Sequence, residues 1–400
     1  MSTAFPRILC LSAIIFLLTS SAIAQHDPGG ITGGGMIGGS TSRPTTKPVI
    51  KPTTKPATTT TTTRPKPKPT TPSVKRPTTT TNTADYYYQR GETLFSAQNY
   101  REALDQYLKA TEINPSMTTA LYRIGWIYND LDDYESAVDP LKRLVSLQSN
   151  NAAAHFELGY AYKKLERYSE ALPIFQTTIR LKPDHAAAHY EIGWINNEQK
   201  NYDAAIRSLR SALQYRASYP EAHNELGYAY RNLGRYPEAI SEYQAAIQLK
   251  PDMGLAHLGL GDVYYYNNTK NCAEAAKSYK RGLELLPGNA TAQYNLGWCY
   301  NDLERYNEAT VELRKAIDAH PDYPEAHNEL GYALHQLGRY QLAVQQYQIA
   351  IQQRPDYGSA HYHLALSFIA LRNRQGALQQ YRILQRIDNA RATKLFNQIK

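Results

Sequence analysis

The chain has 400 residues, with 44 Lys and Arg against 36 Asp and Glu, and only three Cys. Nine of the basic residues lie between positions 25 and 83, so the part of the chain after position 83 has a net charge of −1. A folded nucleic-acid-binding domain carries its basic excess on its own surface, so we expect no nucleic-acid partner for the bulk of the chain, and three cysteines are too few for a disulfide-stapled scaffold.

Residues 1–24 have the pattern of an export signal. Arg7 precedes an apolar run over residues 8–18, and the small residues that follow end at Ala24, which fits cleavage before Gln25. The run is too short to cross about 30 Å of hydrocarbon as a helix, and an uncleaved short anchor is the alternative interpretation. No later stretch resembles a transmembrane segment. We therefore expect a secreted or periplasmic protein.

Residues 25–83 are predicted to form a disordered linker. Residues 29–39 are Gly-rich, and residues 41–83 contain 18 Thr and nine Pro with Lys or Arg spaced among them. Such a segment lacks the apolar side chains that would offset the entropy of ordering it. The simplest interpretation is a solvated stalk. Its clustered cations could instead hold an anionic envelope polymer, and its Thr side chains could carry O-glycans.

From residue 84 onward one motif repeats nine times. A glycine recurs every 34 residues, with one spacing of 36, and an alanine follows it by twelve residues, or fourteen in the long unit. A bulky side chain follows the alanine by four residues, on the same face of a helix. Gly and Ala at matched positions allow two antiparallel helices to approach closely, so each unit is predicted to be a helical hairpin. The glycines are Gly91, Gly125, Gly159, Gly193, Gly227, Gly261, Gly297 and Gly331, with Ala365 in the ninth unit.

This spacing resembles the tetratricopeptide repeat (TPR), and the units at residues 223–251 and 293–321 carry nearly the full pattern of Leu-Gly, Tyr, Ala, aromatic residue and Pro. The resemblance implies an all-α fold, a right-handed superhelical solenoid of nine helix-turn-helix repeats with a concave groove lined by the first helices. Residues 392–400 are expected to cap the last unit, and a poor cap would favour self-association through the terminal repeats. The predicted repeats are 84–117, 118–151, 152–185, 186–219, 220–253, 254–289, 290–323, 324–357 and 358–391.

The groove is the predicted partner site. If the helix phase matches that of the family, the residue after each glycine and the residue three places further on face the concave surface. Trp and Tyr offer contact area with a polar group, and Asn and Arg can hydrogen-bond an extended main chain. The alternative is that this aromatic stripe is packing. The candidate residues are Trp126, Asn129, Tyr160, Lys163, Trp194, Asn197, Tyr228, Arg231, Trp298, Asn301 and Tyr332.

Other chemistry has little support in the sequence. His stands four places before the glycine in six units, but one metal ion cannot bridge imidazoles that are about 8 to 10 Å apart, so we expect a packing role. No catalytic or nucleotide-binding motif stands in a suitable context, so we expect neither an enzyme nor a cofactor. Cys272 and Cys299 could bridge adjacent units in an oxidising compartment, or Cys299 could simply be buried.

Two functions remain open. The first is an exported scaffold that binds a protein or peptide through the groove. The second is an envelope glycan-binding protein, in which the same aromatic side chains stack on sugars and the basic tail binds a polyanion. Protease treatment of the ligand distinguishes them, because only the first loses its target.

Overall fold

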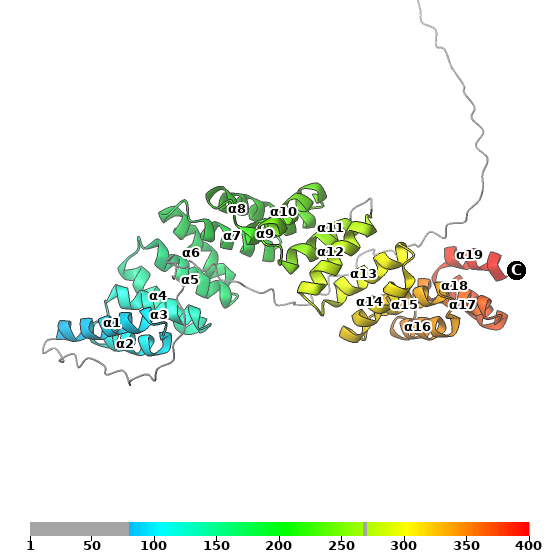
Figure 1. Ribbon diagram of the computed structural model, residues 1–400, viewed down its shortest axis with the longest axis horizontal. Coiled ribbons are helices and arrows are strands. Elements are labelled where there is room, and N and C mark those ends of the chain that lie inside the picture. Colours follow the sequence, from blue (N-terminus) through cyan, green and yellow to red (C-terminus); the bar gives the residue numbers. More distant parts are fainter. Residues whose placement is uncertain (1–79, 267–269, 400) are drawn as a thin grey trace, which may run out of the picture. The chain divides into compact units, whose positions relative to one another are not determined.

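The computed structural model describes residues 80–266 and 270–399, which contain nineteen α-helices and no strand (Figure 1). Eighteen of them form nine consecutive pairs, repeats 1 to 9, so the predicted all-α solenoid of TPR type is confirmed. The first helices are α1 (Thr80–Ser96), α3 (Thr118–Asp130), α5 (Ala152–Lys164), α7 (Ala186–Glu198), α9 (Pro220–Asn232), α11 (Gly254–Tyr266), α13 (Ala290–Asp302), α15 (Pro324–Gln336) and α17 (Gly358–Ala370). The second helices are α2 (Tyr100–Ile113), α4 (Tyr134–Leu147), α6 (Tyr168–Leu181), α8 (Tyr202–Tyr215), α10 (Tyr236–Leu249), α12 (Cys272–Leu285), α14 (Tyr306–Ala319), α16 (Tyr340–Gln353) and α18 (Arg374–Ile387).

The repeats contact one another unequally through their two helices. Each second helix packs on its own first helix and on the first helix of the next repeat. From α3 onward the first helices of successive repeats also contact each other, as α7 does α9 and α13 does α15. The described second helices show no comparable contact with one another. The first helices from α3 to α17 therefore form one continuous face, which we call the first-helix face.

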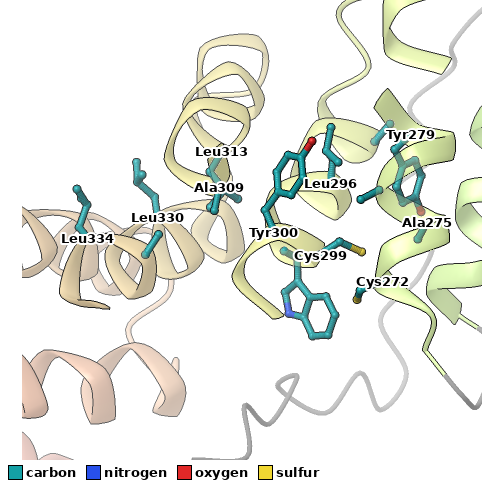
Figure 2. Close-up of a cluster of buried hydrophobic side chains, with 14 of the residues drawn as sticks. Cys272, Ala275, Tyr279, Leu296, Cys299, Tyr300, Ala309, Leu313, Leu330 and Leu334 are labelled. Carbon is teal, nitrogen blue, oxygen red and sulfur yellow. The ribbon is translucent and has the colours of Figure 1, made fainter. Parts of the chain in front are cut away.

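The close approach within each pair depends on the repeated Gly and Ala. A Cβ atom placed on Gly297 would lie 2.5 Å from Leu313 Cγ, and one on Gly159 would lie 2.9 Å from Phe175 Cε1. The repeated alanines of the second helices have no exposed surface. Figure 2 shows such a core, where Ala275 and Tyr279 of α12 lie in one cluster with side chains of α13 and α14. The spacing of small residues thus determines how closely the helices pack.

The turn inside each repeat contains one residue with positive φ, seven places after the repeated glycine or Ala365, or nine places after it in the longer repeat 6. This residue is Gly234 or Gly338 in repeats 5 and 8, with φ of 70° and 71°. In repeats 3 and 7 it is Glu166 or Glu304, each with φ of 58°. A side chain with a Cβ is strained in this left-handed region, so these repeats form the same turn at a higher conformational energy.

The ends of the array differ from the predicted boundaries. Helix α1 begins at Thr80, inside the predicted linker, and the final helix α19 (Asn389–Ile399) begins three residues before the predicted cap. It begins there because the Asp388 carboxylate accepts a hydrogen bond from the Arg391 backbone N–H. Helix α19 packs against α17 and α18 and buries Leu395.

Several sequence predictions concern residues that the structure does not describe. The predicted signal segment, residues 1–24, lies outside the described residues, and so does the predicted linker up to residue 79. None of the helices in the described part of the chain is long and apolar enough to cross a membrane. Export and the role of the basic tail therefore stay predictions.

Candidate functional site

In six repeats the residue after the repeated glycine is aromatic, and its ring packs against the preceding repeat. Trp194 lies edge-on to Tyr168, with the ring centres 5.9 Å apart, and Tyr160 lies in the same way 6.2 Å from Tyr134. In each case the partner is the Tyr that begins the second helix of the preceding repeat. The further pairs of this kind are Trp126 with Tyr100, Tyr228 with Tyr202, and Tyr332 with Tyr306. These rings therefore hold successive repeats together.

The polar residue three places further on bonds to the following repeat. Asn197 Nδ2 donates to both the main-chain oxygen and Oε2 of Glu225, each at 3.0 Å. Lys163 Nζ lies 2.5 Å from Glu191 Oε2, and the exposed fractions of these two side chains are only 5% and 2%. Asn129 with Glu157, and Asn301 with Glu329, repeat the Asn197 arrangement. A buried hydrogen bond or ion pair thus crosses four of the junctions.

These contacts correct the predicted orientation of the partner site. Seven of the eleven candidate residues are buried, because the adjacent repeat covers them. For these seven the expectation of a side chain open to a groove is wrong, whereas a partner-binding role for the stripe stays a prediction. The buried seven are Asn129, Tyr160, Lys163, Trp194, Asn197, Trp298 and Asn301, and the half-buried four are Trp126, Tyr228, Arg231 and Tyr332.

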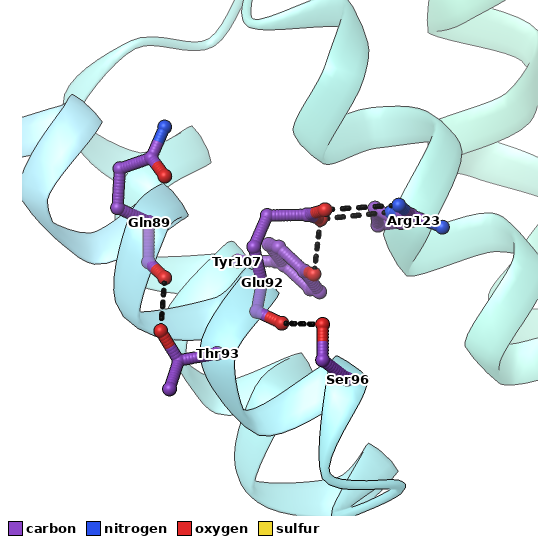
Figure 3. Close-up of polar contacts among 6 residues, drawn as sticks. All are labelled: Gln89, Glu92, Thr93, Ser96, Tyr107 and Arg123. Atoms are coloured by element: carbon purple, nitrogen blue, oxygen red, sulfur yellow. Dashed lines mark hydrogen bonds and ion pairs between the residues drawn. The ribbon is translucent and has the colours of Figure 1, made fainter. Parts of the chain in front are cut away.

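Two junctions contain an arginine–carboxylate pair instead. Between repeats 1 and 2, Arg123 donates to both carboxylate oxygens of Glu92, at 2.8 and 2.9 Å, and Tyr107 Oη donates to Glu92 Oε1 at 2.5 Å (Figure 3). The Arg123 guanidinium also lies 4.1 Å from the centre of the Phe95 ring. Burial raises the pKa of Glu92, but the hydrogen bonds from Arg123 and Tyr107 outweigh burial and hold this pKa below its usual value.

The junction between repeats 5 and 6 uses the same groups in the opposite chain order. Arg231 of repeat 5 pairs with Asp262 Oδ2, and Tyr279 Oη donates to Asp262 Oδ1 at 2.8 Å. Gly259 occupies the position that holds a glutamate in repeats 3, 4, 5 and 8, where a Cβ would lie 2.4 Å from Tyr243 Cζ. Here burial outweighs the favourable contacts and raises the pKa of Asp262.

The repeated histidines make hydrogen bonds at the junctions. His189 Nε2 lies 2.9 Å from Pro183 O, and His257 Nε2 lies 3.0 Å from Pro251 O, in both cases the carbonyl six residues earlier. His361 Nδ1 also lies 2.7 Å from Gln380 Oε1 of its second helix. Among the described residues, no three His, Cys, Asp or Glu side chains gather as possible metal ligands. The packing interpretation of the histidines fits these contacts.

The exposed part of the first-helix face lies elsewhere than the sequence suggested. It includes the last residue of several first helices, one turn beyond the residue that follows the repeated glycine, although Lys164 and Asn232 at this position are half-buried. Asp130, Glu198 and Asp302 hold this position in repeats 2, 4 and 7, and all three are exposed. A negative charge at the C-terminal end of a helix is unfavourable by about 0.3 to 1 kcal/mol. The signal was in the sequence, since each of these acids follows a Trp by four residues.

The repeat pattern has a clear match among protein families. Models described as tetratricopeptide repeat match residues 71–188, 156–223 and 258–313, and a model described as TPR repeat matches residues 227–268, 299–338 and 331–371. The chain belongs to the tetratricopeptide repeat family. Comparison with curated protein sequences finds no match.

Solved structures of TPR proteins resemble parts of this TPR chain. The C-terminal part of a TPR repeat-containing protein from Cytophaga hutchinsonii is 19% identical, with a TM-score of 0.49, over 61% of this chain and 99% of that one. YrrB, described as a TPR protein with an unusual peptide-binding site, is 22% identical, with a TM-score of 0.41, over 46% of this chain and 95% of that one. MamA is 24% identical, with a TM-score of 0.39, over 40% of this chain and 94% of that one.

Proposed function

We propose that this TPR protein is an exported, non-enzymatic scaffold that binds a protein or peptide partner on its first-helix face. The observation that carries the proposal is the continuity of this face, because the first helices of successive repeats contact each other from α3 onward. A continuous row of helices offers contacts to an extended partner over many repeats. Export is inferred from the pattern of residues 1–24.

The chemistry of the face favours a partner with basic groups. Asp130, Glu198 and Asp302 are exposed acids at the ends of three first helices, and each follows a Trp of the same helix by one turn. A partner that presents Lys or Arg side chains to them would form ion pairs across the interface. The half-buried rings of Trp126 and Tyr332 would add apolar contact beside them.

The test is an affinity capture from the native envelope fraction with the chain from Gln25 to Lys400. The Asp130→Asn/Glu198→Gln/Asp302→Asn variant should lose most of the bound partner. The matched control carries Asp139→Asn, Asp203→Asn and Asp318→Asn, which are exposed acids on the second helices of the same three repeats. This control should capture the partner as the parent does.

Two results would contradict the proposal. Equal capture by both variants would remove the first-helix face as the site. A ligand that survives protease digestion of the envelope fraction would instead identify the protein as a glycan binder. Circular dichroism of both variants should match the parent, because none of the six side chains is buried.

A further inference from the structure

Cys272 and Cys299 are the only cysteines in the described part of the chain, and each occupies a position that another residue type holds in the other repeats. The second helix begins with Tyr in repeats 1 to 5, 7 and 8, whereas α12 of repeat 6 begins with Cys272. Cys299 stands two places after Gly297, where repeats 2 to 5 have buried apolar residues, such as Ile127 and Ala161. Both exceptions therefore occur at the single junction between repeats 6 and 7.

The two positions face each other because of the repeat geometry. At five other junctions, the Tyr that begins a second helix packs against the residue one place after the next repeated glycine. Cys299 follows that residue, Trp298, directly. The two cysteines are 3% and 0% exposed and belong to the same buried cluster. Figure 2 shows them side by side between α12 and α13.

The surroundings enclose the pair. The Tyr265 and Trp298 rings meet edge-on with centres 5.2 Å apart, and Lys270 Nζ lies 5.0 Å from the centre of the Trp298 ring. Tyr265 is four places after its repeated glycine, where Asn197 and Lys163 stand in repeats 4 and 3. Asn295 is two places before its repeated glycine, where the Glu bonded to that Asn or Lys stands at four other junctions. Asn295 donates to Tyr279 Oη at 3.1 Å. The junction between repeats 6 and 7 thus differs from its neighbours in its cross-junction contact.

We propose that Cys272 and Cys299 form a disulfide bond that links repeat 6 to repeat 7. The oxidant is a second disulfide, either a small molecule such as oxidised glutathione or a disulfide oxidoreductase. One cysteine first exchanges with the oxidant and releases one thiol, and the other cysteine then displaces the second thiol. Two protein thiols and one oxidant disulfide become one protein disulfide and two thiols, so atoms and electrons balance.

The folded environment determines when the bond forms. The neighbouring Cys272 thiol, together with burial, raises the pKa of the Cys299 thiol. Because the thiolate is the reactive species, the folded, reduced pair reacts slowly with an external disulfide. The bond therefore forms mainly while the chain folds, before α12 and α13 close over the pair.

The test is refolding of the Gln25–Lys400 chain in a glutathione redox buffer, followed by alkylation in denaturant and peptide mass mapping. The expected result is a cross-linked peptide pair that contains Cys272 and Cys299, with neither cysteine alkylated until a reductant is added. Reduction should also speed amide exchange in α12 and α13 by on the order of 10²-fold, because the crosslink restricts the open state. The same chain folded before glutathione is added should oxidise more slowly.

The Cys272→Ala and Cys299→Ala variants are the controls, and reductant should leave their amide exchange in α12 and α13 unchanged. Both cysteines found free, each bound to glutathione, or a crosslink between two chains would overturn the proposal. These measurements require neither export nor a partner, so their outcome is separate from that of the proposed function.

Discussion

The junctions between repeats 1 and 2 and between repeats 5 and 6 contain the same groups in reversed chain order. In both, the carboxylate directly follows the repeated glycine, as Glu92 or Asp262, and accepts a hydrogen bond from a Tyr of its own second helix. Arg123 comes from the repeat after the carboxylate, whereas Arg231 comes from the repeat before it. The TPR spacing thus accommodates this set of groups in either chain order and does not determine which repeat supplies the cation.

The two carboxylates differ in their electrostatic balance. The pKa of Glu92 is lowered, because its hydrogen bonds outweigh burial, whereas the pKa of Asp262 is raised by burial. A lowered pKa stabilises the folded state above the unfolded value and loses this stabilisation as the pH falls. A raised pKa stabilises the folded state at low pH and loses this stabilisation as the pH rises through the folded value. Similar pairs therefore predict opposite responses to acid.

Disrupting the buried Lys163–Glu191 pair between repeats 3 and 4 should cause the largest loss of stability. This pair extends the comparison to two charged side chains that are almost completely buried. Lys163→Met leaves the Glu191 carboxylate buried without its cation, and should destabilise α5 and α7 by about 3–5 kcal/mol. Native-state hydrogen exchange in these helices measures the loss. Lys163→Met/Glu191→Met should recover most of it, and Lys182→Met, an exposed control, should change it by under about 0.5 kcal/mol. A loss below about 1 kcal/mol for Lys163→Met would show that the ion pair is not important at this junction.

A neutral donor tests whether the charge matters. Asn197→Ala removes both hydrogen bonds to Glu225 and should cost about 1–3 kcal/mol in the opening free energy of α7 and α9. A double-mutant cycle with Glu225→Ala isolates the interaction of the two side chains. Asn232→Ala is the control, since Asn232 Nδ2 bonds only within its own helix, to Tyr228 O. Equal losses for Asn197→Ala and Asn232→Ala would contradict the cross-junction role.

The pH response tests the reversed pairs directly. As the pH falls through and below the unfolded glutamate pKa of about 4.3, amide protection in α1 and α3 should fall, because Glu92 binds a proton less readily in the folded state. Protection in α9 and α11 should stay constant or rise over the same range, because Asp262 binds a proton more readily in the folded state. The Arg123→Met variant should lose most of the acid sensitivity of α1 and α3. A parallel fall at both junctions would show that the two carboxylates do not differ.

The sequence predicted the helical hairpins well, because the contacts that make them are local. Gly297 and Leu313 lie within one repeat, and their spacing alone shows that two helices approach closely. The exposure of Asn197 was predicted wrongly, because its partner Glu225 lies 28 residues later, in the next repeat. The periodic glutamate two places before the glycine in repeats 3, 4, 5 and 8 was the available signal for this pairing. The exposure of a residue at a junction can be predicted only when the residues of both adjacent repeats are considered.

Substitution of the turn residues should give the smallest change in stability. These variants also test whether a change inside one repeat alters the stability of distant repeats. Glu304 has φ of 58° where Gly338 of the next repeat has φ of 71°. Glu304→Gly relieves strain of about 1 kcal/mol but adds backbone entropy to the unfolded chain, so a net gain of roughly 0.5 kcal/mol is expected for α13 and α14. Gly338→Ala should lower the stability of α15 and α16, because alanine is strained at the positive φ of this position. No atom lies within 4 Å of the added Cβ, so a steric clash does not contribute to the loss. Exchange in the distant helices α5 and α7 should stay unchanged in both variants, because each repeat contacts only its neighbours. A change there would mean that the array opens as one unit, and the junction energies could then not be read separately.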